Sequence, residues 1–176
     1  HGYKLGEYGA WNKHTNMELD TRVPLIISRE TGYAGRKVNV TSETLVENVD
    51  VFPSIIEAAN LPMPRLDGKS LLPLLDNPQM PWDNAAYSLF ARGKKYMGVT
   101  VTDGKWRYTE WRNGQTQEMF FKELYLHDRS DVAAANLAGL KKYQAEQQRM
   151  AELLYKRFPL NGPSFHDKPK LADNSL

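Results

Sequence analysis

Four side chains near the start of the chain combine a cation, two imidazoles and a phenol: Lys13, His1, His14 and Tyr3. A lysine ammonium group is a compact point charge, which suits it to neutralise charge on oxygen atoms. Three glycines stand among the first nine residues, and no helical or alternating periodicity is present, so a loop is predicted. Most lysines, however, lie on solvated loops without a function, and aromatic or imidazole groups there are also common as packing or surface residues.

Several other kinds of chemistry are excluded by residue type. The 176 residues contain no cysteine, which rules out a disulfide framework, a thiolate zinc site and a cysteine nucleophile within them. His127 and His166 have no ligand partner at metal-like spacing and receive no role.

Composition is that of an ordinary globular protein, with 41% hydrophobic and 25% charged residues. The 23 basic and 21 acidic residues are scattered, so no basic stripe indicates nucleic acid or a membrane as a partner. No apolar run approaches the roughly 18 residues that span a bilayer. Because the chain begins at His1 with no methionine and no leader, we expect it to be part of a longer molecule.

The elements that would position the first residues begin with residues 23–27, a β-branched apolar run that predicts a strand buried on both faces of a parallel sheet. Residues 50–60 predict a helix with Asp50 as N-cap and Pro53 in the first turn. The next stretch holds five prolines and predicts irregular structure, with a subdomain boundary near residues 78–82.

Short β-type runs follow at residues 86–90, 97–101, 106–111 and 123–127, with Asp-Gly and Asn-Gly pairs that predict hairpins. Apolar residues at three- and four-residue steps from Leu137 to Phe158 predict a long amphipathic helix on this small sheet. Trp106, Tyr108 and Trp111 could form an aromatic sugar platform, but their spacing also describes the buried face of a strand, and core packing is favoured.

The opening HGYKLGEYGAWNKHTNMELDTRVPLIIS resembles the second conserved block of type I sulfatases, and its sequence is closest to the iduronate-2-sulfatase-like branch. Three later segments also resemble the family: LVENVDVFPSIIEAANLP, DGKSLLPLL and ELYLHDRSDVAAANLAGL. The resemblance covers roughly residues 1–155. Its matching positions in the first block are His1, Gly2, Gly6, Gly9, Lys13, Glu18, Arg22, Val23 and Pro24.

The resemblance implies an α/β fold of the alkaline-phosphatase-like sulfatase kind. Residues 1–78 would be the C-terminal segment of the catalytic domain, with its parallel or mixed sheet. Residues 79–160 would be a C-terminal subdomain, a small antiparallel sheet packed by a long helix, and residues 161–176 an extended tail. A preceding N-terminal polypeptide or segment is the implied partner.

The family's chemistry uses formylglycine, an oxidised cysteine, as nucleophile, while Ca²⁺ and cationic side chains hold the sulfate. The resemblance gives Lys13 a catalytic contact with the sulfate and leaving oxygen, and gives His1 a place beside the metal-binding aspartate. Because Ca²⁺ prefers oxygen ligands, His1 would be an atypical ligand, and the main ligands and the nucleophile are expected upstream. Tyr3 and His14 could contact the sugar, whereas Glu18 and Arg22 are interpreted as structural.

The function implied is hydrolysis of a sulfate ester on a sulfated glycan, of the uronate 2-O-sulfate or algal polysaccharide type, with this chain inactive alone. The alternatives are a phosphodiesterase or phosphonate hydrolase of the same superfamily and a noncatalytic glycan-binding homologue, because fold resemblance does not fix function. A periplasmic, secreted or lysosomal location follows from the resemblance only.

Overall fold

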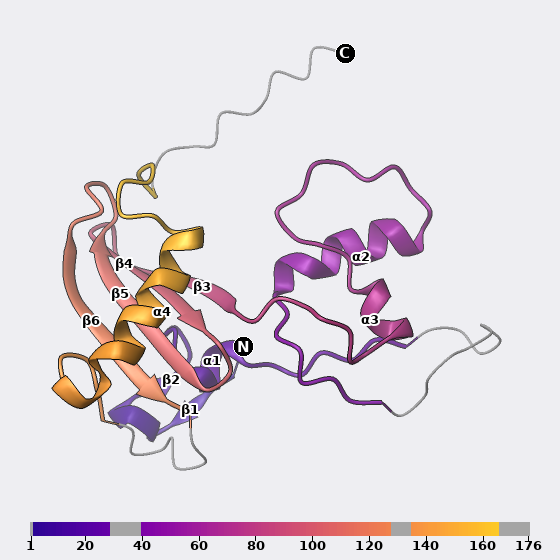
Figure 1. Ribbon diagram of the computed structural model, residues 1–176. Coiled ribbons are helices and arrows are strands. Elements are labelled where there is room, and N and C mark those ends of the chain that lie inside the picture. The colour runs from indigo at the N-terminus through magenta and orange to yellow at the C-terminus, as the bar shows by residue number, and fades with distance from the viewer. Residues whose placement is uncertain (1, 29–39, 128–134, 166–176) are drawn as a thin grey trace. The chain divides into compact units, whose positions relative to one another are not determined.

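A four-stranded sheet forms the centre of the larger of two compact units in the computed structural model, which describes residues 2–28, 40–127 and 135–165 (Figure 1). This unit joins the chain up to Arg22 with the chain from Tyr87 onward, and the second unit is Val23–Ala86. The larger unit contains β1 Lys4–Leu5, η1 Glu7–Gly9, β2 Trp11–Asn12, α1 Glu18–Thr21, β3 Ala86–Arg92 except its first residue, β4 Tyr96–Thr102, β5 Trp106–Asn113, β6 Met119–Leu126, η4 Lys141–Tyr143 and α4 Gln144–Arg157.

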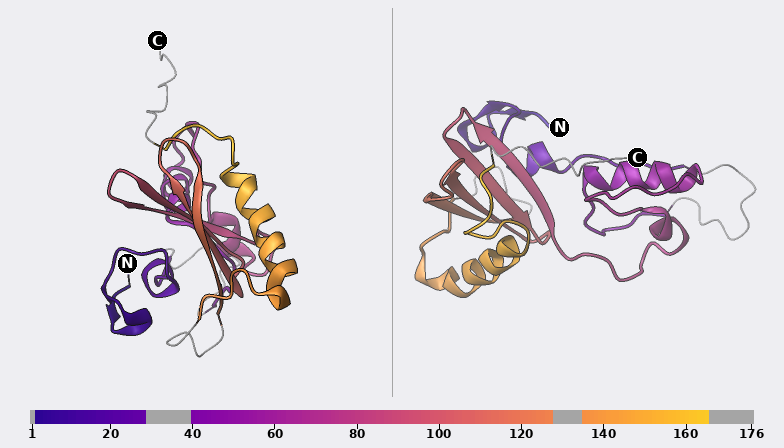
Figure 2. Two further views of the ribbon diagram at one scale, coloured as in Figure 1. Left: turned by 90° about the vertical axis from the view of Figure 1, so that its left-hand side faces the viewer. Right: turned by 90° about the horizontal axis from the view of Figure 1, so that it is seen from above.

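The sheet has the order β3-β4-β5-β6, with β5 antiparallel to both of its neighbours. The strands predicted from residues 86–90, 97–101, 106–111 and 123–127 are thereby confirmed. Seven consecutive residues of β5 are buried, because α4 covers one face of the sheet and the N-terminal segment covers the other (Figure 2).

The face under α4 holds the apolar core. Met150 and Leu154 of α4 are fully buried, as are Val99, Val101 and Leu124 of the sheet, and complete burial of one such side chain stabilises the fold by roughly 1.5–3 kcal/mol. The predicted helix is confirmed but begins later than Leu137. Leu137 instead donates its backbone N–H to the backbone oxygen of Leu124 and precedes the 3-10 helix η4.

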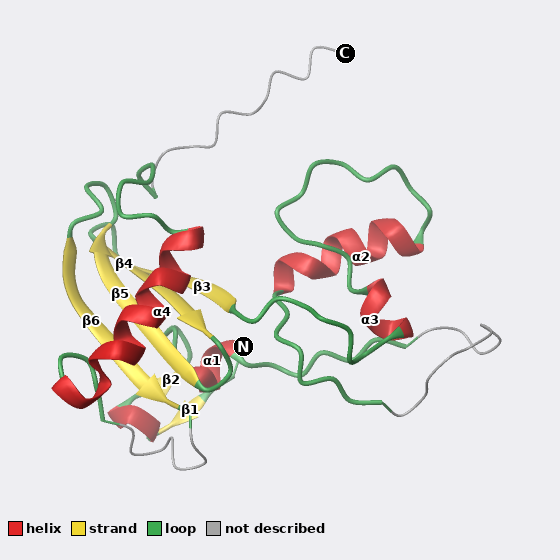
Figure 3. Ribbon diagram, viewed as in Figure 1, coloured by secondary structure: helices red, strands yellow, loops and turns green. Residues whose placement is uncertain are grey.

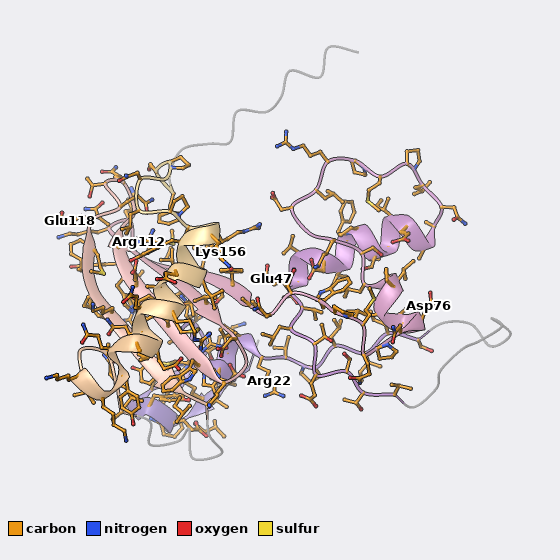
Figure 4. All side chains as sticks on the ribbon, in the orientation of Figure 1. Arg22, Glu47, Asp76, Arg112, Glu118 and Lys156 are labelled. Atoms are coloured by element: carbon orange, nitrogen blue, oxygen red, sulfur yellow. The ribbon has the colours of Figure 1, made fainter. Side chains whose placement is uncertain are left out.

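A buried charge network lies at one end of this face. Arg112 and Glu110 are both fully buried and 2.7 Å apart, and Glu110 also accepts hydrogen bonds from Tyr108 and Tyr155, each at 2.8 Å. Burial, together with Glu110, raises the pKa of Tyr155 to about 12. Arg112, which Figure 4 labels, donates to the backbone of Phe158 at 3.0 Å, so the network fastens the end of α4 to β5.

The three strand aromatics divide between the two faces. Trp106 and Tyr108 lie on the α4 side, where Trp106 meets Tyr143, while Trp111 lies on the opposite side against Phe121. All three are at most 7% exposed, so the preference for core packing is confirmed. The sugar platform imagined from all three together is wrong, because residues at odd spacing on a strand point to opposite faces.

The second unit contains η2 Asn48–Asp50, α2 Val51–Ala58 and α3 Leu72–Asp76. The helix predicted at residues 50–60 is confirmed, with Asp50 at the N-cap position. The Asp50 side chain does not cap α2, however; it accepts backbone N–H groups of Glu47 at 2.9 Å and Lys69 at 3.0 Å. Asp50 therefore joins the start of the helix to the proline-rich stretch that follows it.

The strand predicted at residues 23–27 is wrong for this structure, which shows this segment as irregular (Figure 3). Ile26 is 90% exposed. A strand is defined by hydrogen bonds to a neighbour, and no described residue pairs with this segment. The domain ranges 1–78, 79–160 and 161–176 stay predictions; the compact units group residues 2–22 with the antiparallel sheet instead.

Candidate functional site

Lys13 stands at an exposed point of the N-terminal loop, between two residues with left-handed backbone. Asn12 has φ 71° and His14 has φ 78°, a conformation that costs a non-glycine residue of the order of 1–3 kcal/mol and persists only where surrounding contacts enforce it. Within the described part of the chain, the Lys13 ammonium group makes no hydrogen bond or ion pair. The loop therefore presents an uncompensated cation.

Asp20 is one of the contacts that enforce this loop. It is 5% exposed and lies 2.5 Å from the fully buried ammonium group of Lys4. The same Asp20 oxygen accepts the backbone N–H of Thr15 at 2.8 Å and also the Thr15 hydroxyl. Because Lys4 precedes Lys13 and Thr15 follows it, one buried carboxylate holds both sides of the loop.

Arg107 of β5 holds the loop from the sheet. This guanidinium is 2% exposed and donates to the backbone oxygen of Asn16 at 2.5 Å, to Glu18 at 2.5 Å and to Thr21 at 3.0 Å. The interpretation of Glu18 as structural agrees with this geometry, but its close partner is Arg107, since Arg22 is 3.7 Å away and its side chain is 72% exposed.

His127 also belongs to this anchor, although no sequence signal assigned it a role. Arg107 Nε donates to His127 Nε2 at 3.3 Å, and His127 Nδ1 lies 3.4 Å from Glu18. Arg107 and His127 were missed because they lie about ninety positions or more along the chain from the loop, and no local pattern marks an arginine in a strand as the partner of a distant carboxylate.

The structure brings Tyr3 to the Lys13 turn and turns His14 toward the sheet. The Tyr3 hydroxyl donates to the side chain of Asn12, the residue before Lys13, and Tyr3 remains 59% exposed. The ring of His14 stacks on Phe90 with centroids 6.4 Å apart. His1 lies outside the described residues, so its predicted contacts with substrate and metal stay predictions.

Gly2 permits the close approach that closes the base of the loop. A Cβ atom at this position would lie 1.4 Å from the backbone oxygen of Leu19, and the Gly2 N–H donates to the backbone oxygen of Asp20 at 3.3 Å. Only glycine fits there, which gives a physical reason for this residue of the opening motif.

The described residues do not by themselves make a calcium site. No group of three histidine or acidic side chains among them is placed to hold a metal ion, and Asp20, the buried carboxylate of the loop, is already paired with Lys4. The described part of the chain also has no helix long and apolar enough to cross a membrane.

Comparison with known proteins identifies the class to which this loop and sheet belong. Residues 6–157 match the model of the C-terminal region of N-sulphoglucosamine sulphohydrolase, so the chain belongs to this sulfatase C-terminal family. Enzymes of the sulfatase family generally depend on formylglycine and calcium.

Particular relatives carry sulfatase names. A sulfatase of Formosa agariphila is 31% identical over 121 residues, covering 68% of this chain and 22% of the relative. The human iduronate 2-sulfatase is 27% identical over 194 aligned residues, covering 78% of this chain and 34% of the relative. The chain thus spans between about a fifth and a third of the length of these two relatives.

A solved structure shares the fold of this chain. It is described as a complex with its substrate, D-glucosamine-2-N,6-O-disulfate, and has a TM-score of 0.75 over 94% of this chain and 34% of its own, at 24% identity. Together with the family match, this likeness confirms the sulfatase fold, of the alkaline-phosphatase-like kind, with the antiparallel sheet and C-terminal helix predicted for its C-terminal part.

Proposed function

We propose that this chain is the C-terminal part of an enzyme that hydrolyses a sulfate ester on a sulfated glycan. The observation that carries the proposal is Lys13, an exposed cation without a partner among the described residues, on a loop fixed by two buried charged groups, Asp20 and Arg107. A group that must neutralise charge in a transition state acts best when it is already in place. The anchored loop meets this requirement.

In this proposal, Lys13 binds a non-bridging oxygen of the sulfate and the oxygen that leaves with the sugar. Without the left-handed backbone around Lys13, or without the anchors Asp20 and Arg107, the ammonium group would no longer be held in one position. His14 and Tyr3 line the sugar side, and His1 lies next to the sulfate. In the complete protein, Ca²⁺ would supply the electrophilic clamp and would be held mainly by residues upstream of His1. Formylglycine, itself a modified residue of that upstream part, would supply the nucleophile.

The substrate is proposed to be a sulfated uronic acid, as in a uronate 2-O-sulfate, or a sulfated unit of an algal polysaccharide. The partner is the N-terminal sulfatase polypeptide or segment. A periplasmic, secreted or lysosomal location is proposed with it, because extracellular and lysosomal glycans are the material on which such an enzyme would act. Support comes from family membership and from the names of the relatives.

The first test is mass spectrometry of the complete protein under denaturing conditions, with tryptic peptides searched for a formylglycine residue upstream. Finding it, together with sulfate release from a sulfated uronic acid, would support the proposal. An upstream part with no convertible nucleophile would favour a noncatalytic glycan-binding homologue. Release of phosphate from phosphodiesters or phosphonates without sulfate release would favour the phosphorus-ester hydrolase.

The second test concerns Lys13 itself. Lys13→Ala in the complete protein should lower kcat by about a hundredfold or more, as for loss of one preorganised charge donor, while the unfolding midpoint stays the same. The matched control is Lys105→Ala, since Lys105 is an exposed lysine on the turn between β4 and β5. Equal activity of the two variants would remove Lys13 from the site.

A further inference from the structure

A row of aromatic rings runs from the candidate site across the sheet face opposite α4. His14 stacks on Phe90 at 6.4 Å, Phe90 meets Trp111 edge-on at 6.4 Å, and Trp111 stacks on Phe121 at 5.7 Å with 21° between the ring planes. Trp111 is 7% exposed but Phe121 is 49% exposed. The row therefore begins one residue from Lys13 and ends at an open aromatic surface.

A cavity of about 100 Å³ lies beside this row, between residues 15–17 of the loop and strands β3, β5 and β6. Its walls are of two kinds: the rings of Trp111 and Phe121, and polar groups that include Asn16 and Thr109, which are 5% and 2% exposed. One water occupies about 30 Å³ of liquid, so the cavity holds a few waters or the edge of one sugar ring.

Glu123 supplies a hydrogen-bond acceptor at the cavity wall. One carboxylate oxygen accepts the indole N–H of Trp111 at 3.1 Å. Burial raises the pKa of Glu123 above its ordinary value, against the opposing influence of Trp111 and Arg92. A partly buried carboxylate next to an aromatic face is a suitable partner for a sugar hydroxyl, because the ring packs on C–H groups while the carboxylate accepts the O–H.

Arg92 adds a cation to the same place. It is exposed at the end of β3, lines the cavity, and its guanidinium carbon lies 5.6 Å from the centre of the Trp111 ring. It forms no hydrogen bond or ion pair with any residue that the structure describes. At the same hairpin, the Lys95 ammonium group lies 5.4 Å from the centre of the Phe120 ring. The surface is thus aromatic and basic, which complements an acidic sugar.

We propose that this cavity and its rim form a second carbohydrate subsite, which binds an acidic sugar residue next to the sulfated unit in the substrate chain. Phe121, the exposed ring at the end of the row, packs on the C–H face of that sugar, Glu123 accepts a hydroxyl, and Arg92 pairs with its carboxylate or sulfate group. The subsite rests on the proposed function, because it uses the same glycan chain that reaches Lys13.

The test compares a short substrate with a long one in the complete protein. On a sulfated oligosaccharide with an acidic neighbouring residue, Arg92→Ala and Phe121→Ala should each raise KM about tenfold, as for one lost contact, while leaving KM for the sulfated monosaccharide unchanged. Arg92→Lys should recover part of the loss, because lysine keeps the positive charge but lacks the planar guanidinium group that binds a carboxylate through two hydrogen bonds. The control is Arg149→Ala, on the opposite face of the sheet.

A binding assay separates this subsite from the proposed reaction. In affinity electrophoresis, heparin should retard the Lys13→Ala protein, neutral dextran should not, and adding Arg92→Ala should weaken the retardation by heparin severalfold. Retardation that depends on Arg92, together with no sulfatase activity in the parent protein that retains Lys13, would retain the subsite and reject the proposed reaction. If the protein is an active sulfatase but Arg92→Ala and Phe121→Ala change KM equally for both substrates, or change it for neither, the subsite is overturned. It is also overturned if the upstream polypeptide covers this face of the sheet, so that its amides are protected from hydrogen exchange both with and without heparin.

Discussion

Removing the Arg107 guanidinium should release the loop that carries Lys13. Arg107→Ala deletes donors at 2.5, 2.5 and 3.0 Å to Asn16, Glu18 and Thr21, and it leaves Glu18, whose side chain is 15% exposed, without its close cation. Loss of one partner of a buried ion pair costs about 3–5 kcal/mol. Since the loop can undock and return Glu18 to water, the free energy of undocking sets the upper bound on the stability that Arg107→Ala loses.

Two measurements separate these outcomes. Urea denaturation gives the loss of global stability, and amide hydrogen exchange at residues 15–22 reports local undocking. Arg107→Lys keeps the charge without the fork and should fall between the parent and Arg107→Ala. The unfolding midpoint of the sheet should move less than the exchange rates of the loop if undocking comes first.

The control is Arg149→Ala. Arg149 also pairs with two carboxylates, Asp103 at 2.6 Å and Glu146 at 2.9 Å, but its side chain is 44% exposed. Pairs of this kind contribute about 1 kcal/mol or less. If Arg107→Ala and Arg149→Ala lose the same stability and the loop amides stay protected in both, the anchoring argument fails.

Three further changes test the core, the cavity wall and the second unit. Leu154→Ala should cost about 2–5 kcal/mol in urea denaturation because Leu154 is fully buried, whereas the exposed Lys156→Ala should change stability by less than about 0.5 kcal/mol; similar losses would mean that this helix face is not core. Because burial raises the pKa of Glu123, the folded state binds the carboxyl proton more tightly than the unfolded state, and ionisation costs stability as pH rises above about 4. The free energy of unfolding of Glu123→Gln should therefore increase relative to that of the parent between pH 4 and pH 7. A difference that does not depend on pH would contradict this. Gly68→Ala should destabilise the second unit by about 1–3 kcal/mol, since its Cβ would lie 2.1 Å from the backbone oxygen of Val49; an unchanged thermal midpoint would rule out that contact.

The sequence was sufficient for elements defined by local patterns. All four strands of the sheet were predicted within a few residues, because alternation and the Asp-Gly and Asn-Gly pairs are local signals. The start of α4 was predicted too early because Leu137 and Leu140 continue the helical spacing although both belong to the connection before η4. Residues 23–27 have a strand pattern, but pattern alone supplies no neighbour to pair with.

The candidate site was only half visible in the sequence. Lys13, Tyr3 and His14 could be selected from the resemblance, and their surroundings are consistent with a presented loop. The groups that hold the loop could not, because a buried Lys4–Asp20 pair and a strand arginine look like any other charges until the chain is folded. The division of the strand aromatics between two faces follows from the odd spacing of Tyr108 and Trp111 along β5, and both faces of that strand are buried.

The link between Asn16 and Arg107 joins positions 91 residues apart, which has a consequence for how the protein acquires its site. A ribosome adds about 5–20 residues per second, so the loop is synthesised several seconds or more before the strand that fixes it. During that interval the left-handed backbone around Lys13 has no reason to persist, and a contact this distant in the sequence closes slowly. The candidate site can therefore take its final shape only after β5 has been synthesised and has paired within the sheet.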